Sequence, residues 1–241
     1  MKIIKKIYLL LLFILLSVVI LAQSTDHQQV TDNSATEYLQ ASGSQSALYY
    51  GRIHEGHPRL INHPYLIDER FAKARLSYRG IIYPDVLLRL DLNRSELVIQ
   101  SPGFLNIVLF PEDVEFAELH NQTVIYFQRN NLPGCPPTGY YILLYSGKCE
   151  VLKRQTAALM LANTQQRSTS EFYYDISTLN YLYKDGVYHT IRNKRGLLKI
   201  LYPHKRELKR FISANKLRFR QNSDLFITRT IIEYEKLSSQ L

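Results

Sequence analysis

Alternation of apolar and polar residues between positions 70 and 92 constrains the fold more than any other feature of the chain. Successive side chains of a β-strand point to opposite faces, so a period of two marks a strand with one buried face. Arg79-Gly80 is expected to form the turn between two such strands. Pro84 indicates that the second strand begins or bulges there, or lies at a sheet edge. The buried face of that strand is expected to carry Ile82, Val86, Leu88, Leu90 and Leu92.

Short strand patterns continue through the middle of the chain, separated by turn residues. They are expected at residues 96–100, 104–110, 124–128, 140–145, 149–153 and 172–174. A hairpin is expected to join residues 179–183 to 187–191 across Lys184-Asp185-Gly186. Short strands at this spacing are typical of an antiparallel meander. The sequence therefore predicts a β-rich domain, a meander or sandwich-like arrangement, over residues 47–192.

The spacing of apolar residues lengthens to three or four after this domain, which indicates helices. Short helices are expected at residues 197–201 and 208–212, and Ser223 or Asp224 can cap a third. The sequence therefore predicts an α+β protein. Its C-terminal segment, residues 193–241, would contain two to three helices packed on the β domain.

Residues 1–22 have the form of a secretory signal, because a lysine-rich start precedes a short apolar run at residues 7–21. As a helix this run would span about 22 Å, less than the ~30 Å hydrocarbon core of a membrane. The length favours cleavage after Ala22, or alternatively after Ser24, over a retained N-terminal anchor. Residues 23–46 are polar and are expected to form a disordered spacer. We therefore expect an exported protein, located in the periplasm or associated with the outer membrane.

The formal net charge of +9 is concentrated near the C-terminus, where eleven Lys or Arg and one acid lie between Arg192 and Arg220. The polyanions available to an exported protein are lipid headgroups, lipopolysaccharide, acidic glycans and acidic proteins, so nucleic acid is not expected as a partner. A solvated outer face of amphipathic helices is the alternative interpretation. A surface for an anionic partner, with peripheral outer-membrane association, is predicted at Lys194, Arg195, Lys199, Lys205, Arg206, Lys209, Arg210, Arg218 and Arg220.

Cys135 and Cys149 are the two cysteines, and export would permit a disulfide between them. Closing that loop would contribute about 3 kcal/mol on the chain-entropy model. The strand expected at residues 140–145 lies between them and would span about 20 Å, so the Cys135 loop would have to fold back along it. The sequence leaves the bond open. It predicts no zinc site at these cysteines, because no second ligand pair accompanies them.

His54, Glu55, His57 and His63 are crowded into one segment, and such side chains could hold zinc or copper. Two histidines three apart around Gly56 do not form the helical pair of a metalloprotease motif. Nearby prolines favour a loop. We therefore interpret the segment as an exposed polar loop and predict no metal site.

Asp85, Arg89 and Asp91 are expected on one side of a strand, about 7 Å apart for each step of two residues. Carboxylates at that separation could act as acid and base in glycoside cleavage. An arginine between them would keep both ionised, which favours a solvated face with ion pairs. No serine lies in a Gly-x-Ser-x-Gly turn. The sequence therefore predicts no catalytic residue and no cofactor.

Three parts of the chain together resemble a known group of proteins. They are YRGIIYPDVLLRLD at residues 78–91, GYYILLYSG at 139–147, and YKDGVY at 183–188 followed by KRGLLKILYPHKRELK at 194–209. These stretches resemble a group of exported, functionally uncharacterised proteins of Bacteroidetes-type bacteria, with the likeness running from about Leu76 to the C-terminus. The resemblance implies export and this architecture, and it implies no catalytic residue. Leu90 replaces an expected aromatic, and the loop of Cys135 departs from the group, so the resemblance does not imply the disulfide.

Two functions are compatible with these features. The first is a non-catalytic envelope protein that binds or helps to assemble another component, and the alternative is an envelope hydrolase acting on glycan or peptide. A binding module should present a shallow charged or aromatic face, whereas an enzyme should have a deep cleft with convergent polar groups. The sequence does not specify the oligomeric state.

Overall fold

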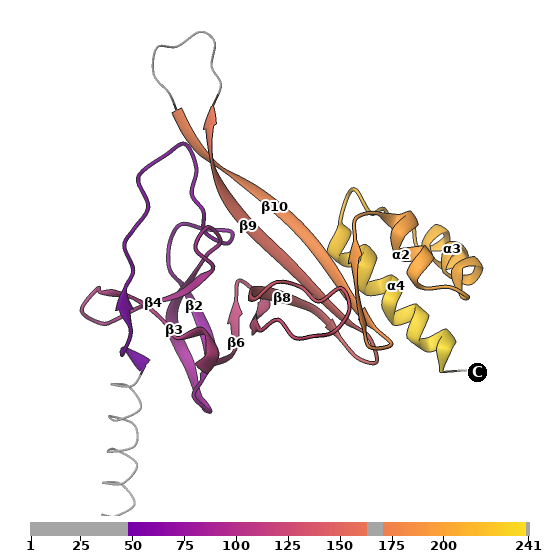
Figure 1. The fold of residues 1–241 in the computed structure, drawn as a ribbon, viewed down its shortest axis with the longest axis horizontal. Coiled ribbons are helices and arrows are strands. Elements are labelled where there is room, and N and C mark those ends of the chain that lie inside the picture. The colour runs from indigo at the N-terminus through magenta and orange to yellow at the C-terminus, as the bar shows by residue number, and fades with distance from the viewer. Residues whose placement is uncertain (1–47, 163–170, 240–241) are drawn as a thin grey trace, which may run out of the picture. The chain divides into compact units, whose positions relative to one another are not determined.

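The computed structural model describes residues 48–162 and 171–239 (Figure 1). The signal peptide and the polar spacer predicted over residues 1–46 lie outside the described residues. By its contacts the chain divides into Met1–Leu48 and Tyr49–Leu241, and all the elements described below belong to the second unit.

Eleven strands in the described residues pair into one antiparallel sheet, in the order β1-β5-β4-β3-β2-β6-β7-β8-β9-β10-β11. Strands β2 to β5 form one meander and β6 to β11 a second. The connection from β5 to β6 passes through a 3-10 helix, η1 (Pro111–Asp113). The strands are β1 (Arg52–Ile53), β2 (Ala72–Tyr78), β3 (Ile81–Asp91), β4 (Glu96–Gln100), β5 (Asn106–Val108), β6 (Val114–Leu119), β7 (Gln122–Phe127), β8 (Gly139–Ser146), β9 (Glu150–Ala162), β10 (Glu171–Lys184) and β11 (Val187–Ile191).

A β-bulge interrupts β3 at its proline, which is one of the outcomes that the sequence predicted. Between the pairs Ala74↔Val86 and Leu76↔Tyr83, β2 advances by two residues and β3 by three. The extra residue reverses the alternation, so Ile82 is 51% exposed and its predicted place on the buried face is wrong. The rest of that predicted face, from Val86 onwards, is buried.

Strands β9 and β10 form a long two-stranded ribbon, paired from Tyr183↔Glu150 to Glu171↔Ala162. The two short strands predicted at residues 172–174 and 179–183 are parts of the single strand β10. Far from the helices, the ribbon is held to the β1–β5 part of the sheet. The Ala157 N–H donates to the Leu92 carbonyl at 3.1 Å, and the Asn62 side chain forms two hydrogen bonds with the backbone of β10.

The C-terminal segment folds into three helices in the described residues, α2 (Lys194–Ile200), α3 (Lys205–Ala214) and α4 (Ser223–Ser238). The Asn193 side chain caps α2, and Asn222 caps α4, one residue before the caps expected. Figure 1 shows these helices beside the end of the ribbon. One apolar cluster joins sheet and helices: Cys149, Val151, Leu182, Ile191, Leu197, Leu198, Leu201, Leu208, Ile212, Phe226, Ile227 and Ile231.

The α+β class, with an antiparallel sheet followed by C-terminal helices, is therefore confirmed. Among the described residues no helix is both long enough and apolar enough to cross a membrane.

Candidate functional site

Five cationic side chains line one open groove beside α2. Its volume is about 910 Å³, and its lining comes from two segments, residues 192–195 and residues 217–221. The first segment joins β11 to α2, and the second joins α3 to α4. The cations are Arg192, Lys194, Arg195, Arg218 and Arg220, and no acidic residue is among the side chains that line the groove.

Local structure explains how the second segment presents its charges. Leu217 and Phe219 pack against the apolar cluster of sheet and helices, and the Phe219 ring meets Phe226 edge to face at 5.5 Å. Arg218 and Arg220 alternate with them and are exposed. The groove therefore combines arginines with an apolar, partly aromatic wall.

No carboxylate in the part of the chain that the structure describes neutralises the charges of the groove. Within residues 48–162 and 171–239, none of the five cations forms an ion pair with a carboxylate. Asp224, the nearest acid in sequence to Arg220, is already paired with Lys153 at 2.7 Å. Lys194 and Arg195 occupy the first turn of α2, where the helix dipole disfavours positive charge. Stabilisation of α2 therefore does not explain why positively charged residues occupy these two positions.

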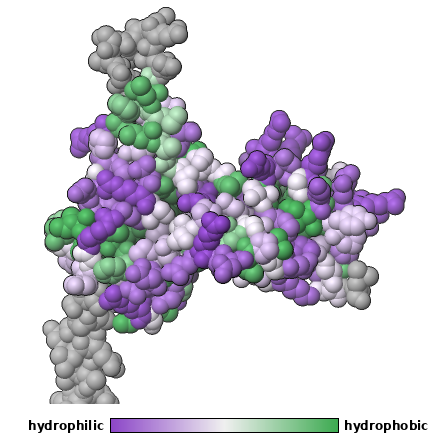
Figure 2. All heavy atoms as spheres, viewed as in Figure 1, coloured by the Kyte–Doolittle hydropathy of each residue, from purple (hydrophilic) through white to green (hydrophobic). Residues whose placement is uncertain are grey.

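The nine basic residues predicted from the sequence are all exposed. Four of them, Lys194, Arg195, Arg218 and Arg220, line the groove, and Arg192 joins them although the prediction did not select it. The position of Arg192 at the start of the basic run could have indicated from the sequence that it belongs to this surface. Lys199 on α2 and the four cations of α3 (Lys205, Arg206, Lys209 and Arg210) do not line the groove. Figure 2 shows hydrophilic side chains projecting over the helical part of the molecule.

Cys135 and Cys149 are free thiols, so the disulfide considered from the sequence is not formed. Cys135 precedes β8 and Cys149 follows it, so the cysteines lie at opposite ends of a strand that spans about 24 Å. Cys149 belongs to the apolar cluster of sheet and helices, whereas Cys135 packs against a different cluster. Burial raises the pKa of the Cys149 thiol to about 11, and the nearby Glu235 carboxylate acts in the same direction.

The predicted charged face of β3 is only partly solvated. Asp85 is exposed and pairs with Lys73 at 3.2 Å. The Arg89 guanidinium lies over the ring of Tyr65, 3.8 Å from the ring centroid. Burial lowers the pKa of Arg89. The Asp91 side chain has no exposed surface, so its interpretation as a solvated group is wrong.

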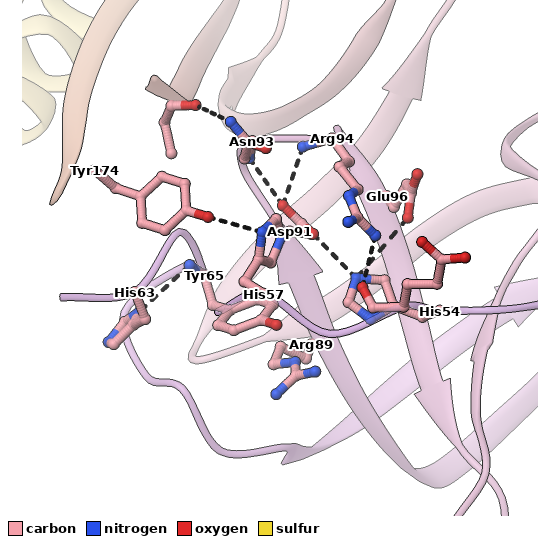
Figure 3. A network of polar contacts seen from close by, with 12 residues as sticks. His54, His57, His63, Tyr65, Arg89, Asp91, Asn93, Arg94, Glu96 and Tyr174 are labelled. Atoms are coloured by element: carbon pink, nitrogen blue, oxygen red, sulfur yellow. Dashed lines mark hydrogen bonds and ion pairs between the residues drawn. The ribbon is translucent and has the colours of Figure 1, made fainter. Parts of the chain in front are cut away.

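Two histidines converge on this buried aspartate (Figure 3). His54 Nε2 lies 3.0 Å from Asp91 Oδ2, and His57 Nε2 lies 2.5 Å from the same oxygen. The exposed fractions of the three side chains are 0%, 6% and 0% for His54, His57 and Asp91. The interpretation of this segment as an exposed loop is therefore wrong for both histidines.

Hydrogen bonds hold Asp91 Oδ1 and His57 Nδ1, whereas the buried His54 Nδ1 has no hydrogen-bond partner among the described residues. Asp91 Oδ1 accepts from the backbone N–H groups of Asn93 at 2.9 Å and Arg94 at 3.0 Å. His57 Nδ1 lies 2.8 Å from the Tyr174 hydroxyl of β10. Burial alone would raise the pKa of Asp91, but the hydrogen bonds from His54, Arg94 and His57 outweigh it and lower the pKa to about 2.

Backbone pairing brings these side chains together. The His54 N–H donates to the Asn106 carbonyl beyond β1, and the following segment runs alongside the end of β3. The backbones of Tyr65 and Asp91 form an isolated antiparallel β-bridge, and the Leu92 N–H donates to the Pro64 carbonyl. A cavity of about 320 Å³ borders this segment, with His57, His63 and Glu69 in its lining. His63 Nδ1 accepts from the N–H of Tyr65, so this imidazole has a different role.

Comparison of the chain with protein-family models, curated proteins and solved structures gives no match. Interpretation of the groove and of the histidine–aspartate cluster therefore rests on their geometry and chemistry.

Proposed function

We propose that this is an exported, non-catalytic cell-envelope protein that binds an anionic envelope component through the groove beside α2. The proposal rests on five cations around one apolar wall, none of which forms an ion pair with a carboxylate of the described residues. Periplasmic location or peripheral outer-membrane association follows from the signal-like N-terminus and belongs to the same proposal.

The groove favours phosphate groups attached to an apolar body. Four of its five cations are arginines, whose planar guanidinium groups can bind phosphate through two parallel hydrogen bonds. Leu217 and Phe219 offer apolar contact beside them. A lipid headgroup combines both properties, since it carries phosphate next to acyl chains. The groove is open, as expected for a site that meets a surface.

Sedimentation with lipid vesicles tests this proposal. The purified protein should bind vesicles that contain an anionic phospholipid and should not bind vesicles of zwitterionic phospholipid alone. Binding should weaken as salt is raised, because salt screens exposed charges. Equal binding to both kinds of vesicle, or binding to neither, would contradict a lipid headgroup as ligand. In the second case, retention on an immobilised acidic protein would assign the basic surface to a protein partner.

A further inference from the structure

We propose that His54, His57 and Asp91 form a binding site for a divalent first-row transition-metal ion of the zinc type. The ligand atoms are the Nε2 atoms of the two histidines and Asp91 Oδ2, which all lie within 4.8 Å of one another. The site is distinct from the basic groove and does not depend on it.

The ligand atoms are close enough to surround an ion of this size after a small expansion. Zinc lies about 2.0–2.2 Å from imidazole nitrogen and carboxylate oxygen, so ligand atoms at two corners of a tetrahedron are roughly 3.3–3.6 Å apart. The separation of 3.0 Å between His54 Nε2 and Asp91 Oδ2 would have to open by a few tenths of an ångström. The separation of 2.5 Å between His57 Nε2 and the same oxygen would have to open by about 1 Å.

The surroundings of the ligands also fit a metal site. Ligating side chains are usually oriented by hydrogen bonds from their remaining polar atoms. Here the Tyr174 hydroxyl fixes Nδ1 of His57, and two backbone N–H groups fix Oδ1 of Asp91. These contacts involve neither His57 Nε2 nor Asp91 Oδ2, the atoms proposed as ligands, and Figure 3 shows His54 and His57 beside Asp91.

An unused carboxylate oxygen provides an independent observation. Within the described residues Glu96 Oε2 is buried and has no hydrogen-bond partner, and it lies 3.9 Å from His54 Nε2. The other oxygen of Glu96 pairs with Arg52. A buried, unpartnered carboxylate oxygen is costly, and a cation beside His54 would compensate it.

The donor set points the same way. Two histidines with carboxylate oxygen are the donor set that favours zinc over calcium or magnesium.

The consequence of such a site would be structural. Its ligands come from the segment after β1 and from the end of β3. The hydroxyl that contacts His57 Nδ1 belongs to Tyr174 of β10. A bound ion would link three parts of the chain that are far apart in sequence. Of the three proposed ligands, His57 also lines the neighbouring cavity.

Zinc binding by the full protein, purified without a histidine tag, tests the proposal. Metal is first removed with a chelator and zinc is added back. The zinc bound per chain is then measured by inductively coupled plasma mass spectrometry. Affinity is measured by competition with a chromophoric chelator. We expect one zinc per chain. His57→Gln and Asp91→Asn should each weaken binding by more than about 100-fold, and Tyr174→Phe by about 10- to 100-fold.

His63→Gln is the matched control, because His63 lies in the same segment and borders the same cavity but is not a proposed ligand. This variant should bind zinc like the wild type. Circular dichroism of each metal-free variant checks that the fold is retained, and Tyr174→Phe provides a mild change if the ligand variants fail to fold. The proposal would be overturned if wild-type protein binds no zinc. Equal loss in His63→Gln, or no loss in the folded ligand or Tyr174 variants, would also overturn it.

Discussion

Lys153 on β9 and Asp224 in the first turn of α4 form an ion pair, with Nζ 2.7 Å from Oδ2. This contact joins the sheet to the C-terminal helices at the edge of their shared apolar cluster. Lys153 is only 8% exposed, so its ammonium group depends on that partner.

We predict that Asp224→Ala lowers the free energy of unfolding by about 2 kcal/mol, because it leaves a buried ammonium group unpaired. The double variant Lys153→Met/Asp224→Ala should recover most of the loss, since it removes the buried charge as well. Urea unfolding of the three proteins measures both effects. If the double variant is less stable than Asp224→Ala, the ion pair does not have this role.

Gly134 allows the loop before β8 to approach β11 closely. Its φ is +69°, and a Cβ atom there would lie 2.1 Å from the Tyr188 carbonyl oxygen. The Tyr188 N–H also donates to the carbonyl of Pro133 at 2.9 Å. We predict that Gly134→Ala costs more than about 2 kcal/mol of stability, because backbone must move.

Gly186 is the matched control for this prediction. Its φ is +80°, but a Cβ atom there would meet open space. Gly186→Ala should therefore cost only about 1 kcal/mol, which reflects backbone strain without a clash. Thermal or urea unfolding of both variants gives the comparison. Equal costs would mean that the approach of residue 134 to β11 is looser than described.

Cys149 should be unreactive in the folded protein. Burial raises its pKa to about 11, so at pH 8 only about one thiol in a thousand would be the reactive thiolate. Thiolate is the deprotonated form, so reactivity should rise as the pH approaches 11. Mass spectrometry after brief alkylation should show label on Cys135 before Cys149. Under denaturing, non-reducing conditions both should react, whereas failure of both would indicate a disulfide.

Zinc should stabilise the protein if the proposed site exists. An ion that binds only the folded state at 100 times its dissociation constant adds about 2.7 kcal/mol to the free energy of unfolding. The unfolding midpoint of wild-type protein should rise with zinc, and that of Asp91→Asn should not. A similar rise in both proteins would indicate binding elsewhere.

Much of the fold follows from the periodicity of the sequence. The alternation before Leu92 and the longer spacing after Asn193 are local signals, and the strands and helices they predict are present. The bulge at Pro84 was one of several outcomes, and only pairing with β2 decides it. The length of β10 was missed because its polar middle, residues 175–178, has no clear apolar pattern.

The histidine–aspartate cluster could not be predicted from local patterns. His54 and Asp91 are 37 residues apart, and the alternation of β3 places Asp91 on its polar face. That face is covered because the segment before β2 runs alongside it, with Tyr65 bridged to Asp91. The basic groove was easier to predict, since charge is visible in the sequence. Which of the cations gather depends on how residues 217–221 return towards α2.

We propose that the groove beside α2, rather than positive charge in general, binds the anionic component. The direct test compares two variants with the same change of charge. Arg195→Glu/Arg218→Glu reverses two exposed groove cations, and Lys205→Glu/Lys209→Glu reverses two exposed cations of α3 outside it. The measurement is the dissociation constant for vesicles containing anionic phospholipid. The account predicts at least about 10-fold weaker binding for the groove variant and a clearly smaller loss for the α3 variant. Equal losses in the two variants would contradict it.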